Sequence, residues 1–468
     1  MRPTSLPTDP PAAPPTATGR PARLPQIDVM RLLICASVVA THVVGNANPG
    51  DSVAANGAVN LLHYTRQAFF FISALVLVHA SRGGPGQLLR RVRVLGVPYL
   101  VWSTFYAALG LLTAYSWWAL VRWPRTWFVG LLQGTDGYHM YFLLVSVEFA
   151  VIFPGFVWLL RVTRGHHGML LLGSGALELA TMALFHYVYQ PDGWWRAIAG
   201  ESSLTAYQFW VVAGGLAGMH LREFHDWLLG HRALVWGALL AICAASTAIF
   251  FANVAGGEEP EFAGRSLQPV TVPLSLAAIG GFYLLSVSIA NIRRPGAQRL
   301  IVAGTYLSFG IYLSHPAILT GLLYLQKQLP ESVARHAVAV TLAIFVVDFG
   351  FAVLAAALLS RTRWSRALVG RPRRRRDAAS AGVTPAPPML GAAAPGAAAL
   401  GEAGLGAAGL GEAGLGEAGL GAAGLGAAGL GAVAPGTVAA EAVAAGAAAA
   451  GTAPEPAGSP EPAAAPAG

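Results

Sequence analysis

Apolar residues occur in runs of about 20 along most of the chain, and each run is long enough to cross a bilayer as a helix. Ten such runs can be marked, with polar or Gly- and Pro-containing loops between them. The pattern predicts an all-α, polytopic membrane helix bundle with about ten transmembrane helices. The predicted spans are 27–47, 61–80, 94–116, 138–160, 168–188, 203–221, 233–253, 271–290, 300–323 and 334–360.

The distribution of positive charge predicts the orientation of these spans. Lys and Arg number 30 against 22 Asp and Glu, a formal net charge of +8. In a soluble protein this balance would suggest a nucleic-acid partner, which we do not expect here, because the arginines collect in alternate loops. The arginine-rich loops follow the second, fourth, sixth, eighth and tenth predicted spans. The positive-inside rule then places both termini in the cytoplasm.

Composition divides the chain into four regions. Residues 1–26 form a Pro/Ala/Thr-rich leader, expected to be disordered and cytoplasmic, and residues 27–360 form the transmembrane domain. A basic juxtamembrane segment covers 361–376, and an Ala/Gly/Pro-rich low-complexity tail covers 377–468. The tail contains a five-residue repeat with too much glycine for a helix and too little apolar surface for a core. We therefore expect the tail to be disordered.

The first predicted span carries two ionisable side chains, Arg31 and His42, eleven residues apart. At about 100° and 1.5 Å per residue, they share one helix face within roughly 20° and lie about 16 Å apart along it. Ionisable groups inside a membrane helix are costly and are usually kept for function. The alternative is structural: Asp28 pairs with Arg31 at the interface, and His42 binds a neighbouring carbonyl.

A second polar group lies in the ninth predicted span, where Ser308, Tyr312 and His315 share one face by their i, i+4, i+7 spacing. His315 lies as far from the cytoplasmic start of its span as His42 does from the start of the first span. Both spans run outward, so we expect the two histidines at similar depth in one shared polar site. Pro316 is expected to bend the helix and free a carbonyl there. Two unrelated histidines with local hydrogen bonds are the alternative.

Three carboxylates fall within apolar spans: Glu148, Glu178 and Asp348. A carboxylate in the bilayer needs a partner or a proton. We expect one of them, with Glu148 as the candidate catalytic group, to orient or recharge a histidine. The sequence leaves open which of the three does so, and a purely structural role is the alternative for each.

The arginines Arg90, Arg91 and Arg93 lie just before Pro98, at the cytoplasmic start of the third span. They are either positive-inside charge or a clamp for the phosphates of a nucleotide-bearing donor such as coenzyme A. The two cysteines, Cys35 and Cys243, fall in apolar spans and are expected to be core residues. No Cys/His set has zinc spacing, so we expect no metal site.

Several segments together resemble the membrane acyltransferase 3 family, which includes bacterial integral-membrane O-acyltransferases of polysaccharides, lipids and antibiotics. Arg31 and His42 match its first-span Arg-x10-His pattern, and residues 69–74 resemble its Phe-Phe-x-x-Ser-Gly signature. Residues 90–99 resemble the loop before its third span. Residues 141–143 resemble its Trp-Phe-Leu motif, and 312–315 its late Tyr-x-x-His motif. The chain has Ala where the Phe-Phe-x-x-Ser-Gly signature has Gly, and Tyr where the Trp-Phe-Leu motif has Trp.

The resemblance implies an integral-membrane acyltransferase of the bacterial cytoplasmic (inner) membrane. Such an enzyme moves an acyl group, here expected to be acetyl, from acyl-CoA to a hydroxyl or amine of a carbohydrate or glycosylated lipid. Acyl-CoA would enter from the cytoplasm, and the acceptor would bind at the outer face. Because acyl-CoA is a substrate, no permanently bound cofactor is expected.

Under this hypothesis Arg31 and one or more of the arginines in 90–93 bind the donor phosphates, and His42 acts as general base. A transient acyl-histidine stays open as a second mechanism. Tyr312 and His315 would position the acceptor or stabilise the developing oxyanion. The alternative function is a proton-coupled transporter or flippase without acyl transfer, which would use the same groups as a proton relay. A membrane anchor or sensor is a third hypothesis.

Overall fold

The apolar runs form helices whose bounds follow most of the predicted spans. The computed structural model describes residues 24–80, 85–114, 116–188, 200, 202–292 and 294–373, and no strand occurs among them. The helices, α-helical unless marked, are α1 (Pro25–Asn46), α2 (Val53–Leu62), α3 (Tyr64–His79), α4 (Pro85–Ala114), α5 (Trp117–Gln133), α6 (Met140–Val162), α7 (His167–Ala183), the π-helical turn η1 (Leu184–Val188), the 3₁₀ turn η2 (Leu204–Tyr207), α9 (Gln208–Met219), α10 (Leu221–Gly230), α11 (Arg232–Ala255), α12 (Pro260–Ala263), α13 (Thr271–Ala290), α14 (Pro295–Gln326), α15 (Glu331–Ala334), α16 (Ala337–Leu359) and α17 (Ser365–Val369).

Within these residues, nine helical segments are long and apolar enough to cross a membrane. They are α1, α2 with α3, most of α4, α6, α7 with η1, α11, α13, α14 and α16. The all-α polytopic bundle predicted from the hydrophobic pattern is therefore confirmed. The cytoplasmic position of the termini stays a prediction. Residues 1–23 of the expected leader and the expected tail at 377–468 lie outside the described residues.

The sixth predicted span, 203–221, is shorter than expected. It consists of η2 and α9, and α9 has 12 residues, about 18 Å at the α-helical rise. Every residue from Phe209 to Gly218 is buried, so protein surrounds this helix on all sides. Helix α9 therefore differs from the membrane-spanning helices in its length and not in its apolar character.

Small residues allow α9 to lie directly against α3. A Cβ on Gly214 would collide with the carbonyl of Phe71, and a Cβ on Gly218 would meet the carbonyl of Leu75. The two glycines are four residues apart and so lie on one face of the helix. This is the small-residue spacing that brings membrane helices into backbone contact.

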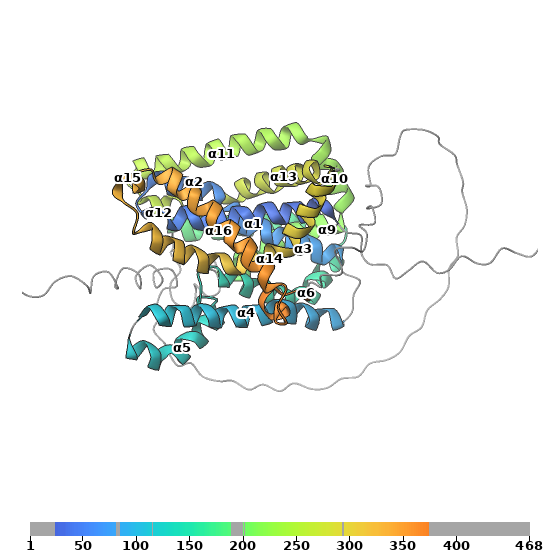
Figure 1. Cartoon of the computed structure of the whole chain (residues 1–468). Helices are drawn as coiled ribbons and strands as arrows, with labels where there is room; N and C mark the ends of the chain where they lie inside the picture. Colours follow the sequence, from blue (N-terminus) through green and yellow to red (C-terminus); the bar gives the residue numbers. More distant parts are fainter. Residues whose placement is uncertain are drawn as a thin grey trace, which may run out of the picture. The chain divides into compact units, whose positions relative to one another are not determined.

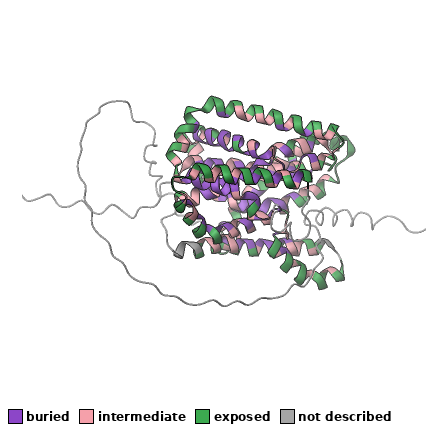
Figure 2. Cartoon of the chain, turned by 180° about the vertical axis from the view of Figure 1, so that it is seen from behind, coloured by how far each residue is buried: buried purple, intermediate pink, exposed green. Residues whose placement is uncertain are grey.

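Helix α1 lies at the centre of the bundle and packs against α2, α3, α13, α14 and α16. Figure 1 shows α11 at one edge of the bundle and α4 with α5 at the opposite edge, with α1, α3, α13 and α14 between them. Figure 2 shows that burial follows this arrangement. The outward face of α11 is exposed, and the inner helices are mostly buried. The side chains of α1 are therefore the best placed to meet residues from several other helices.

Several helices form where only loops were expected, α5 and α17 among them. Helix α5 carries exposed Trp117, Trp118 and Phe128 and packs against α4. Its aromatic and arginine content is typical of a helix at a membrane interface. Helix α17 follows the last span and packs against α4, α14 and α16. Part of the basic segment at 361–376 therefore contacts the bundle.

Candidate active site

The two histidines indicated by helix periodicity lie side by side. The ring centroids of His42 on α1 and His315 on α14 are 5.5 Å apart, with an angle of 29° between the planes. The two helices approach closely, and the Cys35 thiol donates to the carbonyl of Ser308 at 3.4 Å. His315 is fully buried and His42 is half-buried. The expected meeting of the two side chains is found, and their catalytic role stays a prediction.

Pro316 determines which nitrogen of His315 can accept a proton. Proline has no N–H, so the carbonyl of Tyr312, four residues earlier, lacks its helical donor. The His315 ring supplies the missing donor: Nδ1 lies 2.8 Å from the Tyr312 carbonyl oxygen and 3.3 Å from that of Ile311. Since a carbonyl only accepts, Nδ1 carries the hydrogen, and Nε2 of the neutral ring has the lone pair. Nε2 is buried and has no hydrogen-bond partner among the described residues.

A third imidazole, missed by the sequence reasoning, comes from the loop 134–139 between α5 and α6. The ring centroid of His139 lies 5.8 Å from that of His315, and Tyr138 lies 4.6 Å from His42. Both ring nitrogens of His139 are buried without a hydrogen-bond partner in the described part of the chain. A usable signal existed: His139 stands at the outer start of an inward-running predicted span, and His42 lies in the outer half of its own. His42, His139 and His315 are called the histidine cluster below.

Two contacts hold the loop 134–139 in position. Gly134 ends α5 with φ +70°, and a Cβ there would collide with the backbone of Tyr141. The Tyr312 hydroxyl donates to the carbonyl of His139. Because its hydrogen is committed to this carbonyl, Tyr312 acts in this structure by positioning the loop. Its expected part in stabilising an oxyanion stays a prediction.

The same loop carries a carboxyl group that titrates near neutral pH. The Asp136 carboxylate packs against Gly130 of α5, where a side chain would collide with it. Its Oδ2 is buried and has no hydrogen-bond partner among the residues described. Burial raises the pKa of Asp136 to about 7, and the nearby Ser103 hydroxyl opposes this rise. Loss of the proton from Asp136 thus adds a negative charge three residues from His139.

Arg66, in the first turn of α3, is a second residue that sequence reasoning missed. Its Nη1 donates to the Ser266 hydroxyl at 2.8 Å, and its guanidinium lies 5.7 Å from the centre of the Tyr141 ring. The positive charge of Arg66 acts electrostatically on His42. The available signal was an arginine inside a predicted apolar span, three residues before Phe69. The guanidinium of Arg66, held by Ser266 and Tyr141, therefore carries a positive charge whose field reaches His42.

No described contact joins Glu148 or Glu178 to this cluster, whereas Asp348 acts electrostatically on Tyr106 and Tyr138, whose rings pack against His139 and His42. Glu148 faces the backbone of Leu204, and no described contact joins its side chain to the cluster. It lies nine residues after His139, about 13.5 Å along α6. Glu178 accepts hydrogen bonds from Trp210 Nε1 at 3.1 Å and from a glutamine amide at 3.2 Å. Asp348 is fully buried, and neither oxygen has a hydrogen-bond partner in the described region. The catalytic role expected for Glu148 stays a prediction.

The predicted phosphate-binding arginines have different surroundings. Arg31 is half-buried on α1, eleven residues before His42. The Arg91 guanidinium lies 4.4 Å from the centre of the Phe153 ring on α6. Arg90 and Arg93 are exposed in the first turns of α4. Arg91 therefore makes a cation–π contact, whereas Arg90 and Arg93 are exposed.

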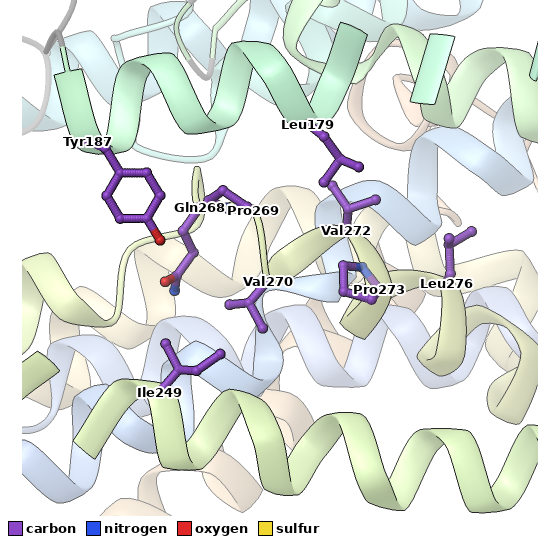
Figure 3. Close-up of a pocket in the computed structure, with 9 residues that line it drawn as sticks. All are labelled: Leu179, Tyr187, Ile249, Gln268, Pro269, Val270, Val272, Pro273 and Leu276. Carbon is purple, nitrogen blue, oxygen red and sulfur yellow. The ribbon is translucent and has the colours of Figure 1, made fainter. Parts of the chain in front are cut away.

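A hollow of about 540 Å³ lies between α7 with η1, α11 and α13 (Figure 3). Apolar side chains such as Leu179, Val270 and Pro273 dominate its lining, with Tyr187 and Gln268 as the polar exceptions. It shares no residue with the histidine cluster. In the described ranges, no group of three His, Cys, Asp or Glu side chains is arranged to hold a metal ion.

Comparison with known proteins adds one finding to this geometry. A family model described as an acyltransferase domain, Acyl_transf_3, matches residues 24–361. The match begins just before α1 and ends just after α16, so it includes the histidine cluster, Arg31, Arg66 and the arginines near the start of α4. No curated protein and no solved structure matches the chain.

Proposed function

From the premise that this chain belongs to the Acyl_transf_3 family of membrane acyltransferases, we propose that it moves an acyl group from acyl-CoA to a carbohydrate or glycosylated lipid. The acceptor group is a hydroxyl or an amine, and the expected acyl group is acetyl. One observation carries the proposal: His42 is paired with His315, whose Nε2 is a buried proton acceptor without a partner among the described residues. Activation of a hydroxyl or amine for acyl transfer requires such a group.

The proposed donor enters from the cytoplasmic side. Arg31 and the arginines of 90–93 bind its phosphates, because a guanidinium offers two parallel N–H donors to phosphate oxygens. Arg31 and His42 lie about 16 Å apart along one face of α1, given the helical rise and turn. A donor held by its phosphates at Arg31 can therefore extend its thioester along α1 toward the histidine cluster.

The proposed step is a direct transfer assisted by a general base. For a hydroxyl acceptor, His42 or Nε2 of His315 removes the hydroxyl proton while the oxygen attacks the thioester carbonyl. The oxyanion that forms lies in the positive field of Arg66. When the intermediate collapses, the carbon–sulfur bond breaks, and the imidazolium returns its proton to the coenzyme A thiolate. The products are the acylated acceptor and free coenzyme A.

We place the protein in the bacterial cytoplasmic (inner) membrane, with both termini in the cytoplasm. The arginine-rich loops after alternate predicted spans support this orientation. His42 then lies in the outer half of α1, so the acceptor approaches from the outer face. The loop 134–139, which carries Tyr138 and His139, is expected at this side of the site.

Transfer of labelled acetyl from acetyl-CoA tests the proposal in membranes that carry the wild-type chain, His42→Ala or His315→Ala. Envelope glycans and glycolipids serve as acceptors. His231→Ala is the matched control, since His231 is exposed and its ring contacts Trp227 of the preceding helix. We expect transfer with the wild type and the control, and none with the two cluster variants at equal abundance in the membrane.

Two results would contradict the proposal. Full transfer by His42→Ala would remove that histidine from the chemistry. No transfer by the wild type, with acetyl-CoA or a panel of longer acyl-CoAs, would overturn the proposed reaction.

A further inference from the structure

The segment after the last membrane span turns back and packs onto the bundle. Trp102 Nε1 on α4 donates to the carbonyl of Leu368 at 2.9 Å, and the Tyr306 hydroxyl on α14 donates to that of Pro372 at 2.8 Å. Val369 is buried, and a Cβ on Gly310 of α14 would stand 2.9 Å from its Cγ1. These contacts from two helices hold the backbone of residues 368–372 at a defined place between α4 and α14.

A left-handed glycine directs the chain at this point. Gly370 has φ +63°, and a Cβ on it would stand 3.0 Å from the Phe309 ring and 3.2 Å from the carbonyl oxygen of Val94. A side chain here would therefore be strained in its backbone conformation and crowded by its surroundings. The turn brings the next residue, Arg371, to the surface of α14.

Arg371 has contacts that an ordinary juxtamembrane arginine lacks. Its Nη2 lies 3.5 Å from the carbonyl oxygen of Thr305, and its guanidinium lies 5.2 Å from the centre of the Tyr306 ring. The Thr305 hydroxyl also donates to the carbonyl of Asp28 on α1 at 3.2 Å. Asp28 is one helical turn before Arg31, so Arg371 is placed beside the part of α1 that carries Arg31.

The local charges favour an anion at this place. Helices α1 and α14 approach closely here, since a Cβ on Gly304 would stand 2.7 Å from the Leu32 side chain. Among the described residues, Asp28 and Arg371 are the charged groups that act on Arg31. Two guanidinium groups and one carboxylate, all on half-buried residues, together carry a net charge of +1. A phosphate would balance this charge and accept hydrogen bonds from both guanidinium groups.

We propose that Arg371 joins Arg31 in binding a phosphate group of the acyl-CoA donor, so that the segment after the last span forms part of the donor site. This inference rests on the proposed function. It differs from the sequence-based interpretation, in which the arginines after the last span act only as orientation charge. It also assigns Arg371 a role that its neighbour Arg373, which is exposed, does not share.

The test is calorimetric binding of coenzyme A, and of pantetheine as a probe without the phosphates, to the full chain in phosphatidylcholine nanodiscs. We expect Arg371→Gln to raise the Kd for coenzyme A about tenfold, which corresponds to about 1.4 kcal/mol. Arg373→Gln, the matched control, should change it by less than about twofold, because an exposed charge contributes little. Pantetheine should bind with the same Kd to the wild type, Arg371→Gln and Arg373→Gln. Arg371→Lys, which keeps the charge but loses the planar donor pair, should be intermediate.

The outcomes separate this inference from the proposed function. Equal Kd values for the wild type and Arg371→Gln would overturn the inference and leave the acyltransferase reaction standing. No coenzyme A binding by the wild type would overturn the inference, while the transfer assay decides the function. If phosphatidylglycerol in the nanodisc weakened coenzyme A binding to the wild type but not to Arg371→Gln, the site would belong to a lipid phosphate, and the inference would be wrong. Thermal unfolding of each variant confirms that it is folded.

Discussion

Replacement of Pro316 by alanine is expected to separate the stability of α14 from the chemistry of His315. The substitution restores an N–H at position 316, which then competes with Nδ1 of His315 for the carbonyl of Tyr312. The second acceptor of Nδ1, the Ile311 carbonyl, is 3.3 Å away and offers only a longer bond. We therefore expect a protein that is more stable than the wild type and yet slower.

The expected gain in stability and the expected loss of rate both follow from the local hydrogen bonds. A proline inside a helix costs about 3 kcal/mol, and a single hydrogen bond contributes about 1 kcal/mol. Because the His315 ring already replaces one lost helix bond, the expected gain in the free energy of unfolding is about 2 kcal/mol. Weakening the Nδ1 bond by about 0.5–1.5 kcal/mol reduces the population of rings with a lone pair on Nε2. Turnover should then fall about two- to tenfold.

The assay combines thermal unfolding of the purified chain with initial rates of labelled acetyl transfer at saturating acetyl-CoA. Pro154→Ala is the matched control, since Pro154 also lies inside a membrane helix, α6, but is exposed and lies about 22 Å along that helix from His139. The control should gain stability at an unchanged rate. If Pro316→Ala also gained stability and kept the wild-type rate, the claim that Pro316 selects the reactive nitrogen of His315 would be refuted.

Three further predictions concern the surroundings of the cluster. Arg66→Gln should lower turnover at least about tenfold with an unchanged KM for acetyl-CoA, because the oxyanion loses its nearby charge; steady-state rates decide this, and an unchanged kcat would exclude the role. The raised pKa of Asp136, about 7, means that the native state keeps a proton that the unfolded chain loses near pH 4, so stability falls between about pH 4 and 7. Between pH 5 and 7.5 the melting temperature should therefore fall less steeply in Asp136→Asn than in the wild type or the exposed control Asp51→Asn. Parallel plots of melting temperature against pH would contradict the raised pKa of Asp136. Gly134→Ala should destabilise the protein by more than the 1–2 kcal/mol or so of a left-handed alanine. Gly165→Ala is its control, because Gly165 has φ +90° and open space around it; equal melting temperatures of the two variants would disprove the contact with Tyr141.

The features predictable from sequence are those that one helix defines alone. Arg31 and His42 share a face because of the helical repeat, and His315 precedes a proline whose effect is local. Their meeting followed from one added assumption, that both spans start at the same membrane face. The family motifs, the all-α class and most span bounds are likewise properties of single segments.

The parts that sequence did not indicate depend on contacts between distant segments. The predicted spans place His139 at the outer side of the membrane, but its contact with the cluster depends on the path of a loop, which periodicity does not describe. Arg66 lies in an apolar span that was interpreted only as membrane-spanning. Arg371 lies in a basic run that the positive-inside rule already explained. For Glu148, a position within an apolar span does not say which neighbour the carboxylate faces, and its catalytic role stays a prediction.

The shortness of α9 has a consequence for how the protein is made. A helix of 12 residues is about 18 Å long, less than the roughly 30 Å of a bilayer core, so hydrophobic length alone does not retain it during insertion. What holds it is contact with α3, which the ribosome has already produced when α9 emerges. Gly214 and Gly218 are therefore constraints on biogenesis: a larger residue there would leave a nascent chain with an undocked segment before any substrate is bound.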